Sequence, residues 1–167
     1  MEYAGTLLTI AELAVALAGF ASLVSVIARS RNNRSRAIDA FRLHTMLEMA
    51  LRNAAFALAP LPFLQMLPSD PIVWRVASGL YMISTALYMV RARMRARSLE
   101  GVASEPWILV STLSIASISF VMNFTNVVGL GGSNAFSIYL GVLVLGLVTT
   151  GVLFLSVAAS VFSEPGS

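Results

Sequence analysis

Long apolar runs alternate with short polar segments along this chain, and five of the runs are long enough to cross a membrane. A spanning helix needs about 20 mainly apolar residues, because it crosses a hydrocarbon layer of about 30 Å at about 1.5 Å per residue. The pattern predicts an all-α fold, an integral membrane bundle of five transmembrane helices that forms a single domain over residues 1–167. The predicted spans are residues 3–28, 41–67, 72–90, 106–128 and 135–162.

The second run is the most irregular, since its first half carries His44, Glu48, Arg52 and Asn53. Arginine-rich segments mark cytoplasmic loops, and such segments lie at 29–36 and at 91–97. Two cytoplasmic loops require an even number of crossings between them, so the second run is predicted to span, with the N-terminus outside and the C-terminus inside. Pro60 and Pro62 are predicted to break or kink its outer half, which frees backbone carbonyls that need another partner.

The composition supports a membrane location and excludes two other classes of protein. Of the 167 residues, 57% are hydrophobic and 11% are charged, whereas soluble domains carry about 25% charged residues and disordered chains have low hydrophobicity. The net charge of +3 and the pI near 10.0 arise from 11 arginines, most of which lie in the two clusters beside apolar runs. We therefore interpret the basic residues as the orientation signal of a protein embedded in the lipid bilayer, with no nucleic-acid partner.

The sequence contains few groups that support catalysis. It has no cysteine and one histidine, which excludes a catalytic thiol and argues against most zinc, di-iron and bis-histidine haem sites. It also contains no HExxH, GxSxG, Walker or dinucleotide-binding motif. We expect neither an enzyme nor a bound metal or cofactor.

Two charges lie deep inside predicted spans and at similar depths. Glu12 falls about two turns inside the first span and Arg52 lies near the middle of the second, at depths that differ by about 10 Å or less. A charge at the bilayer centre costs about 2.5–3.5 kcal/mol on insertion scales, so each of these residues needs a partner. We expect a buried contact between Glu12 and Arg52.

Polar residues form a stripe on each of two predicted helices. His44, Glu48 and Arg52 are spaced four residues apart on the second span. The stripe on the fourth span consists of Thr112, Ala116, Ser119, Asn123 and Asn126. One interpretation is a relay or ion path, because imidazole titrates near neutral pH and polar side chains line aqueous paths. The other is a polar seam whose hydroxyls and amides hold helices together, at about 0.6 kcal/mol each.

Small residues mark the faces on which helices pack, because lipid supplies no hydrophobic drive for association between helices. They are Ala14, Ala18, Gly19 and Ser22 on the first span, and Gly141, Gly146 and Gly151 on the fifth. We expect these faces to serve contacts within the bundle and the association of copies into a homo-oligomer.

The first span, with Glu12 followed several residues later by Ala18-Gly19-Phe20, resembles that of a group of small uncharacterised bacterial multi-pass inner-membrane proteins. The segment Leu58-Ala59-Pro60-Leu61 is also similar to theirs, and the resemblance covers about 60 residues. It implies a multi-pass location in the bacterial cytoplasmic (inner) membrane and makes Glu12 a characteristic residue. It implies no activity.

Two functions are consistent with these features. The first is a self-associating helical bundle that forms or gates a path for ions, protons or a small solute. The alternative is a non-catalytic accessory or structural subunit, whose polar residues dock it to a larger membrane complex.

Overall fold

The computed structural model describes residues 2–28, 33–66, 71–98 and 106–162, and within these ranges the chain is helical and contains no strand. The all-α prediction is therefore confirmed for this part of the chain. The elements are α1 (Glu2–Ala28), α2 (Asn33–Leu58), α3 (Leu61–Met66), α4 (Pro71–Ser98), α5 (Pro106–Val127), η1 (Gly132–Asn134) and α6 (Ala135–Phe162).

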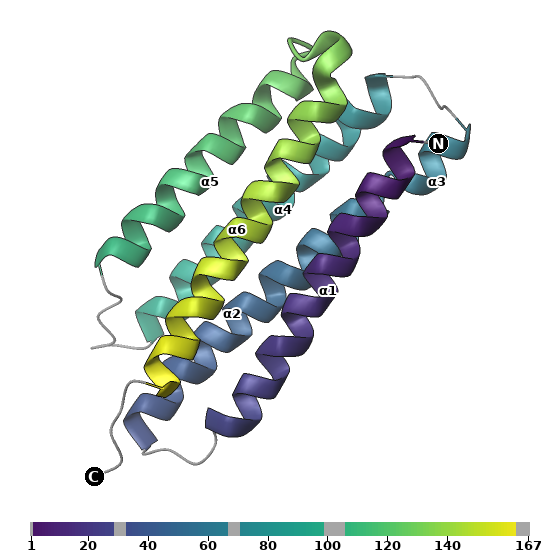
Figure 1. Ribbon diagram of the computed structural model, residues 1–167. Helices are drawn as coiled ribbons and strands as arrows, with labels where there is room; N and C mark the ends of the chain where they lie inside the picture. Colours follow the sequence, from purple (N-terminus) through teal and green to yellow (C-terminus); the bar gives the residue numbers. More distant parts are fainter. Residues whose placement is uncertain (1, 29–32, 67–70, 99–105, 163–167) are drawn as a thin grey trace.

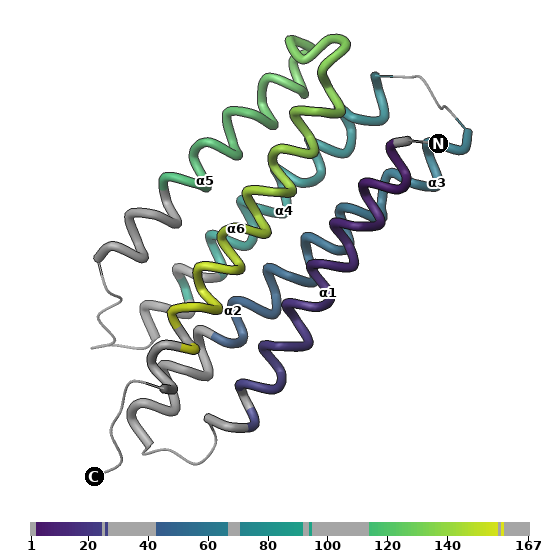
Figure 2. Tube along the Cα trace, viewed as in Figure 1, coloured from purple at the N-terminus to yellow at the C-terminus, as the bar shows by residue number. Residues whose placement is uncertain are grey.

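The long helices form a bundle in which consecutive members run in opposite directions (Figure 1). The beginnings of α1 and α4 and the turn between α5 and α6 lie at one end, and α6 finishes at the other. Figure 2 traces α5 and α6 through that turn. α6 is the central helix, since it contacts α1, α2, α4 and α5, while α1 packs mainly against α2. Short connections explain the antiparallel order, because they leave each helix beside its neighbour in sequence.

By length and composition, three helices in the described part of the chain are apolar enough to cross a membrane. These candidate spans are Tyr3–Val24, Pro71–Arg91 and Gly132–Ser156. They coincide with the first, third and fifth predicted spans. The candidate span that contains most of α6 has a mean hydropathy of 2.4, the highest of the three, which fits the central place of that helix.

The second apolar run is divided between two helices, so residues 41–67 do not form one continuous helix. α2 ends at Leu58, a turn covers residues 59–60, and α3 follows. Pro60 has no N–H to donate to the carbonyl of Phe56, one turn earlier. The hydroxyl of Tyr139 on α6 donates to that carbonyl at 2.6 Å instead. The carbonyl freed by the predicted break at Pro60 is thus satisfied by a neighbouring helix.

Many large hydrophobic side chains are exposed on the outer surface of the bundle, and several polar side chains are buried inside it. Exposed hydrophobic residues occur on every long helix, for example Phe20, Leu51, Leu80, Phe124 and Leu155. The buried polar residues in the described part of the chain are Asn53, Ser78, Ser119, Asn123, Asn126, Thr149 and Thr150. This distribution suits a helix bundle surrounded by lipid, in which polar groups must find their partners between helices.

Candidate functional site

Asn53 links three helices in the middle of the bundle. Its side chain is 1% exposed, and its Nδ2 donates to the carbonyl of Leu143 on α6 at 2.9 Å. The hydroxyl of Tyr81 on α4 donates to its Oδ1 at 3.0 Å. Gly146 lies so close that an added Cβ would be 2.5 Å from the Asn53 Oδ1. The contact between α2 and α6 therefore requires glycine at this position.

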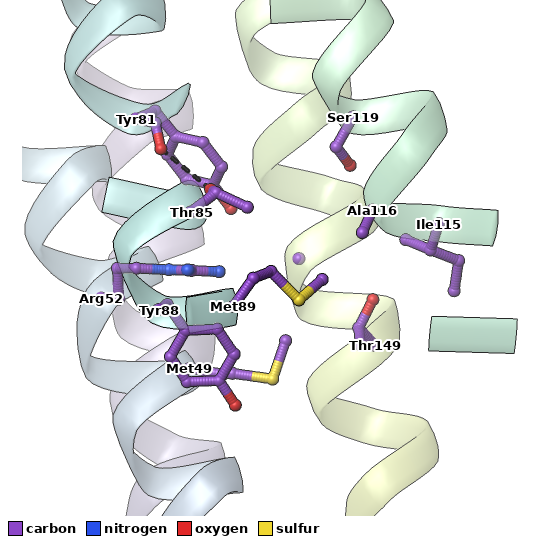
Figure 3. A pocket seen from close by; sticks show the side chains of 11 residues that line it. Met49, Arg52, Tyr81, Thr85, Tyr88, Met89, Ile115, Ala116, Ser119 and Thr149 are labelled. Carbon is purple, nitrogen blue, oxygen red and sulfur yellow. Dashed lines mark hydrogen bonds between the residues drawn. The ribbon is translucent and has the colours of Figure 1, made fainter. Parts of the chain in front are cut away.

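Arg52, the residue of α2 that precedes Asn53, extends between two aromatic rings of α4. Its Cζ lies 5.4 Å from the ring centroid of Tyr81 and 4.9 Å from that of Tyr88. Figure 3 shows the guanidinium between the two rings. The Nε and Nη1 atoms of Arg52 are buried and have no hydrogen-bond partner. The two rings stabilise the positive charge, by about 0.5–2 kcal/mol each, but they leave these two donors unpaired.

The side chain of Arg52 reaches a cavity of about 30 Å³ between α2, α4, α5 and α6, which we name the Arg52 cavity (Figure 3). It is lined by Met49, Arg52, Tyr81, Thr85, Tyr88, Met89, Ile115, Ala116, Ser119, Gly146 and Thr149. This volume holds about two water molecules. The hydroxyl of Thr85 donates to the carbonyl of Tyr81, and that of Thr149 donates to the carbonyl of Leu145, both at 2.8 Å. These two hydroxyls have therefore used their hydrogen atoms, and they can only accept a hydrogen bond from an occupant of the cavity.

The expected contact between Glu12 and Arg52 is not formed, and this corrects the sequence analysis. Glu12 is exposed on the outside of α1, whereas Arg52 reaches a cavity to which α1 contributes no lining residue. α1 buries Leu7, Ala11 and Ala14 on its inner face. Similar depth in the membrane is thus not sufficient for contact, because the rotation of α1 about its axis directs the carboxylate outward.

The structure brings His44 and Glu48 together near the start of the predicted stripe. The His44 Nδ1 lies 3.8 Å from the Glu48 Oε2, and the two side chains are 65% and 27% exposed. His44 therefore lies on the surface of the bundle, whereas Arg52, two turns further along α2, extends inward. The predicted stripe runs from the surface towards the Arg52 cavity.

Three residues of the stripe on α5, namely Ser119, Asn123 and Asn126, have different environments. Ser119 lines the Arg52 cavity. The Nδ2 of Asn123 donates to the carbonyl of Ser119 in its own helix at 3.0 Å. The Nδ2 of Asn126 lies between the Ser78 Oγ on α4 at 2.9 Å and the carbonyl of Ala135 on α6 at 2.8 Å. Asn126 thus connects α5 to two other helices, whereas the side-chain hydrogen bond of Asn123 stays within α5.

The predicted small-residue faces are partly inside the bundle and partly outside it. Ala14 and Ala18 are buried on α1, while Gly19 and Ser22 are exposed on the same helix. On α6, an added Cβ at Gly141 would lie 2.8 Å from the Met122 Cε, and one at Gly146 would meet Asn53. An added Cβ at Gly151 would have no neighbour within 4 Å. Close approach of helices therefore explains Gly141 and Gly146 but not Gly151.

Several residues of the site were missed by the sequence analysis. They are Ser78, Tyr81, Tyr88, Thr149 and Thr150. A signal for two of them exists, because Tyr81 and Tyr88 are seven residues apart and so share one face of α4. Their contact with Arg52 depends on how α2 and α4 pack, which the sequence alone does not give.

The described residues offer no metal site, since they contain no group of three histidine, cysteine, aspartate or glutamate side chains placed to hold an ion. What the site offers is a guanidinium with two unpaired donors beside a small cavity. No protein-family model matches the chain, and no curated protein or solved structure shows significant similarity to it.

Proposed function

We propose that this protein is a multi-pass protein of the bacterial inner membrane, a five-span bundle that forms or gates a path for ions, protons or a small solute. The N-terminus lies outside and the C-terminus inside in this proposal. The observation that carries it is the guanidinium of Arg52, whose Nε and Nη1 are buried without partners beside a cavity lined in part by hydroxyl groups. Charges inside membrane proteins are costly, and they commonly mark ion or substrate pathways.

The depth of Arg52 supports this function. The guanidinium lies against Tyr81, which is the middle residue of the candidate span Pro71–Arg91. On the other side of the cavity, Gly146 and Thr149 belong to the candidate span Gly132–Ser156. In the proposal the charge therefore lies at the level of the hydrocarbon layer, where burying a charge costs the most free energy.

The hydrogen bonds of Asn53 support a path that is gated, with the structure corresponding to the closed state in the proposal. Asn53 joins Tyr81 and Leu143 at the level of the cavity wall. The cavity extends from this level towards Met49 and Tyr88, in the direction of the arginine cluster at 91–97. In the proposal, opening requires Asn53 to release Tyr81, at a net cost of about 0.5–1.5 kcal/mol per hydrogen bond.

Cysteine accessibility tests whether the cavity is reached by water, and the chain has no native cysteine. Thr149 lines the cavity, whereas its neighbour Thr150 is fully buried and donates to the carbonyl of Gly146 at 2.9 Å. We expect silver ions applied from the cytoplasmic side to block the Thr149→Cys thiol at least about tenfold faster than the Thr150→Cys thiol, because only the former faces the cavity. The remaining thiol is counted by a mass-tagged maleimide after denaturation.

Equal blocking rates for the two variants, or no blocking of Thr149→Cys from the cytoplasmic side, would contradict the proposed path. Blocking from the outer side alone would contradict the proposed orientation.

The alternative function, an accessory subunit docked to a larger complex, is favoured by Glu12. This carboxylate is exposed on α1 within the candidate span Tyr3–Val24, where contact with lipid is costly. Gly5 and Gly19 are exposed on the same helix, and an added Cβ at either would have no neighbour within 4 Å. The face has room for a helix from a second copy or from another protein. A homo-oligomer in mild detergent that conducts ions after reconstitution into liposomes supports the path, whereas an electrically silent monomer that co-purifies with one stable partner supports the accessory subunit.

A further inference from the structure

The Arg52 cavity has an unbalanced charge. Among the described residues that line it, Arg52 carries the only formal charge, and the others are apolar, aromatic or hydroxyl-bearing. The nearest acidic residue along α2 is Glu48, whose Oε2 lies 3.8 Å from the His44 Nδ1 at the surface of the bundle. The carboxylate of Glu12 is exposed on α1. The lining therefore supplies positive charge to whatever occupies the cavity.

The lining of the cavity also contains hydrogen-bond donors that have no acceptor. The Nε and Nη1 of Arg52 are buried N–H donors without acceptors, although the rings of Tyr81 and Tyr88 contact the cation and the hydroxyl of Tyr81 also interacts with the guanidinium. Figure 3 shows the hydroxyl of Ser119 pointing towards the same space from α5. Thr85 and Thr149 offer only lone pairs to this space, whereas the guanidinium on one side and the Ser119 hydroxyl on another can donate to an anion.

We propose that the Arg52 cavity binds a small inorganic anion of the size of chloride, held between the guanidinium of Arg52 and the hydroxyl of Ser119. This inference rests on the proposed function and names the class of ion that uses the path. The cavity volume of about 30 Å³ suits a small inorganic anion, because it gives room for about two water molecules.

The test is the thermal unfolding of the purified full chain in detergent, followed by tryptophan fluorescence, as chloride replaces gluconate at constant ionic strength. We expect the wild-type Tm to rise saturably, by about 3–6 °C at a chloride concentration ten times the dissociation constant. Arg52→Met removes the charge and keeps an unbranched side chain, and it is expected to abolish the rise. Arg75→Met is the control, because Arg75 is exposed and lies outside the cavity lining.

A second measurement decides the matter should Arg52→Met fail to fold. Chloride binding to the wild type is expected to broaden the chloride-35 resonance, bromide is expected to reverse the broadening, and Ser119→Ala is expected to weaken binding about tenfold. A wild type without chloride-specific broadening or Tm rise would overturn the inference and leave a cavity that holds water only. A Tm rise retained in folded Arg52→Met, or unchanged binding in Ser119→Ala, would overturn the assigned site.

The failure of this inference can be distinguished from failure of the proposed function. Chloride binding without any flux through the reconstituted protein would support the anion site and contradict the proposed path. Flux of cations or of an uncharged solute without chloride binding upholds the path and removes the anion site.

Discussion

Replacing Gly146 with alanine is expected to lower the free energy of unfolding by about 2–4 kcal/mol. An added Cβ would lie 2.5 Å from the Oδ1 and 2.7 Å from the Nδ2 of Asn53, which is too close for any pair of atoms that do not bond. Asn53 is 1% exposed and is held by hydrogen bonds with Leu143 and Tyr81. The methyl group therefore either strains the contact between α2 and α6 or breaks the bonds of Asn53 to Tyr81 and Leu143, and both outcomes are costly.

Gly151→Ala is the matched control on the same helix, since an added Cβ there has no neighbour within 4 Å. Alanine has a higher helix propensity than glycine, so this variant is expected to be unchanged or more stable by up to about 1 kcal/mol. The comparison is made by reversible unfolding of both variants in mixed detergent micelles. Equal stability of the two variants would show that the close approach of Gly146 to Asn53 does not exist.

Asn126→Ala is expected to destabilise the bundle by about 2–4 kcal/mol, because Asn126 joins three helices. Its Nδ2 contacts the Ser78 Oγ and the carbonyl of Ala135, and its removal leaves both groups without this partner and opens a small cavity. Asn123→Ala is the matched control on α5. Both asparagines are at least 99% buried, but the Nδ2 of Asn123 bonds only to its own helix.

The Asn123 variant removes the same number of atoms from an equally buried position, so we expect it to cost about 1 kcal/mol. The difference between the two variants measures the bonds between helices, and it is read from the same unfolding experiment. If Asn123→Ala were as destabilising as Asn126→Ala, burial rather than the connection between helices would account for both residues.

The sequence predicted the features that depend on apolar length and on local backbone chemistry. Three helices that are long and apolar enough to span coincide with predicted runs, and the predicted break lies at Pro60. The partner of the Phe56 carbonyl was not predictable in the same way. It is the hydroxyl of Tyr139, which is 83 positions away in the sequence, and only tertiary packing brings the two together.

The rotation of each helix about its axis was the main feature that the sequence did not reveal. α1 is apolar on nearly all sides, with exposed residues such as Leu13 and Phe20 as well as buried Leu7. Hydrophobic periodicity therefore did not indicate which face packs inward, because lipid and protein interior are both apolar. The depth of Glu12 was used to pair it with Arg52, but its direction on the helix is what separates them.

In the proposed function, Arg52 binds an ion and does not only hold helices together. Chloride efflux from proteoliposomes tests it most directly, with the wild type, Arg52→Gln and the control Arg75→Gln reconstituted at equal density. We expect chloride efflux above that of protein-free vesicles for the wild type and for Arg75→Gln. For Arg52→Gln we expect efflux to fall at least about tenfold, because a charged hydrogen bond to the ion is lost. Wild-type efflux equal to that of protein-free vesicles, or undiminished efflux through Arg52→Gln, would contradict this role of Arg52.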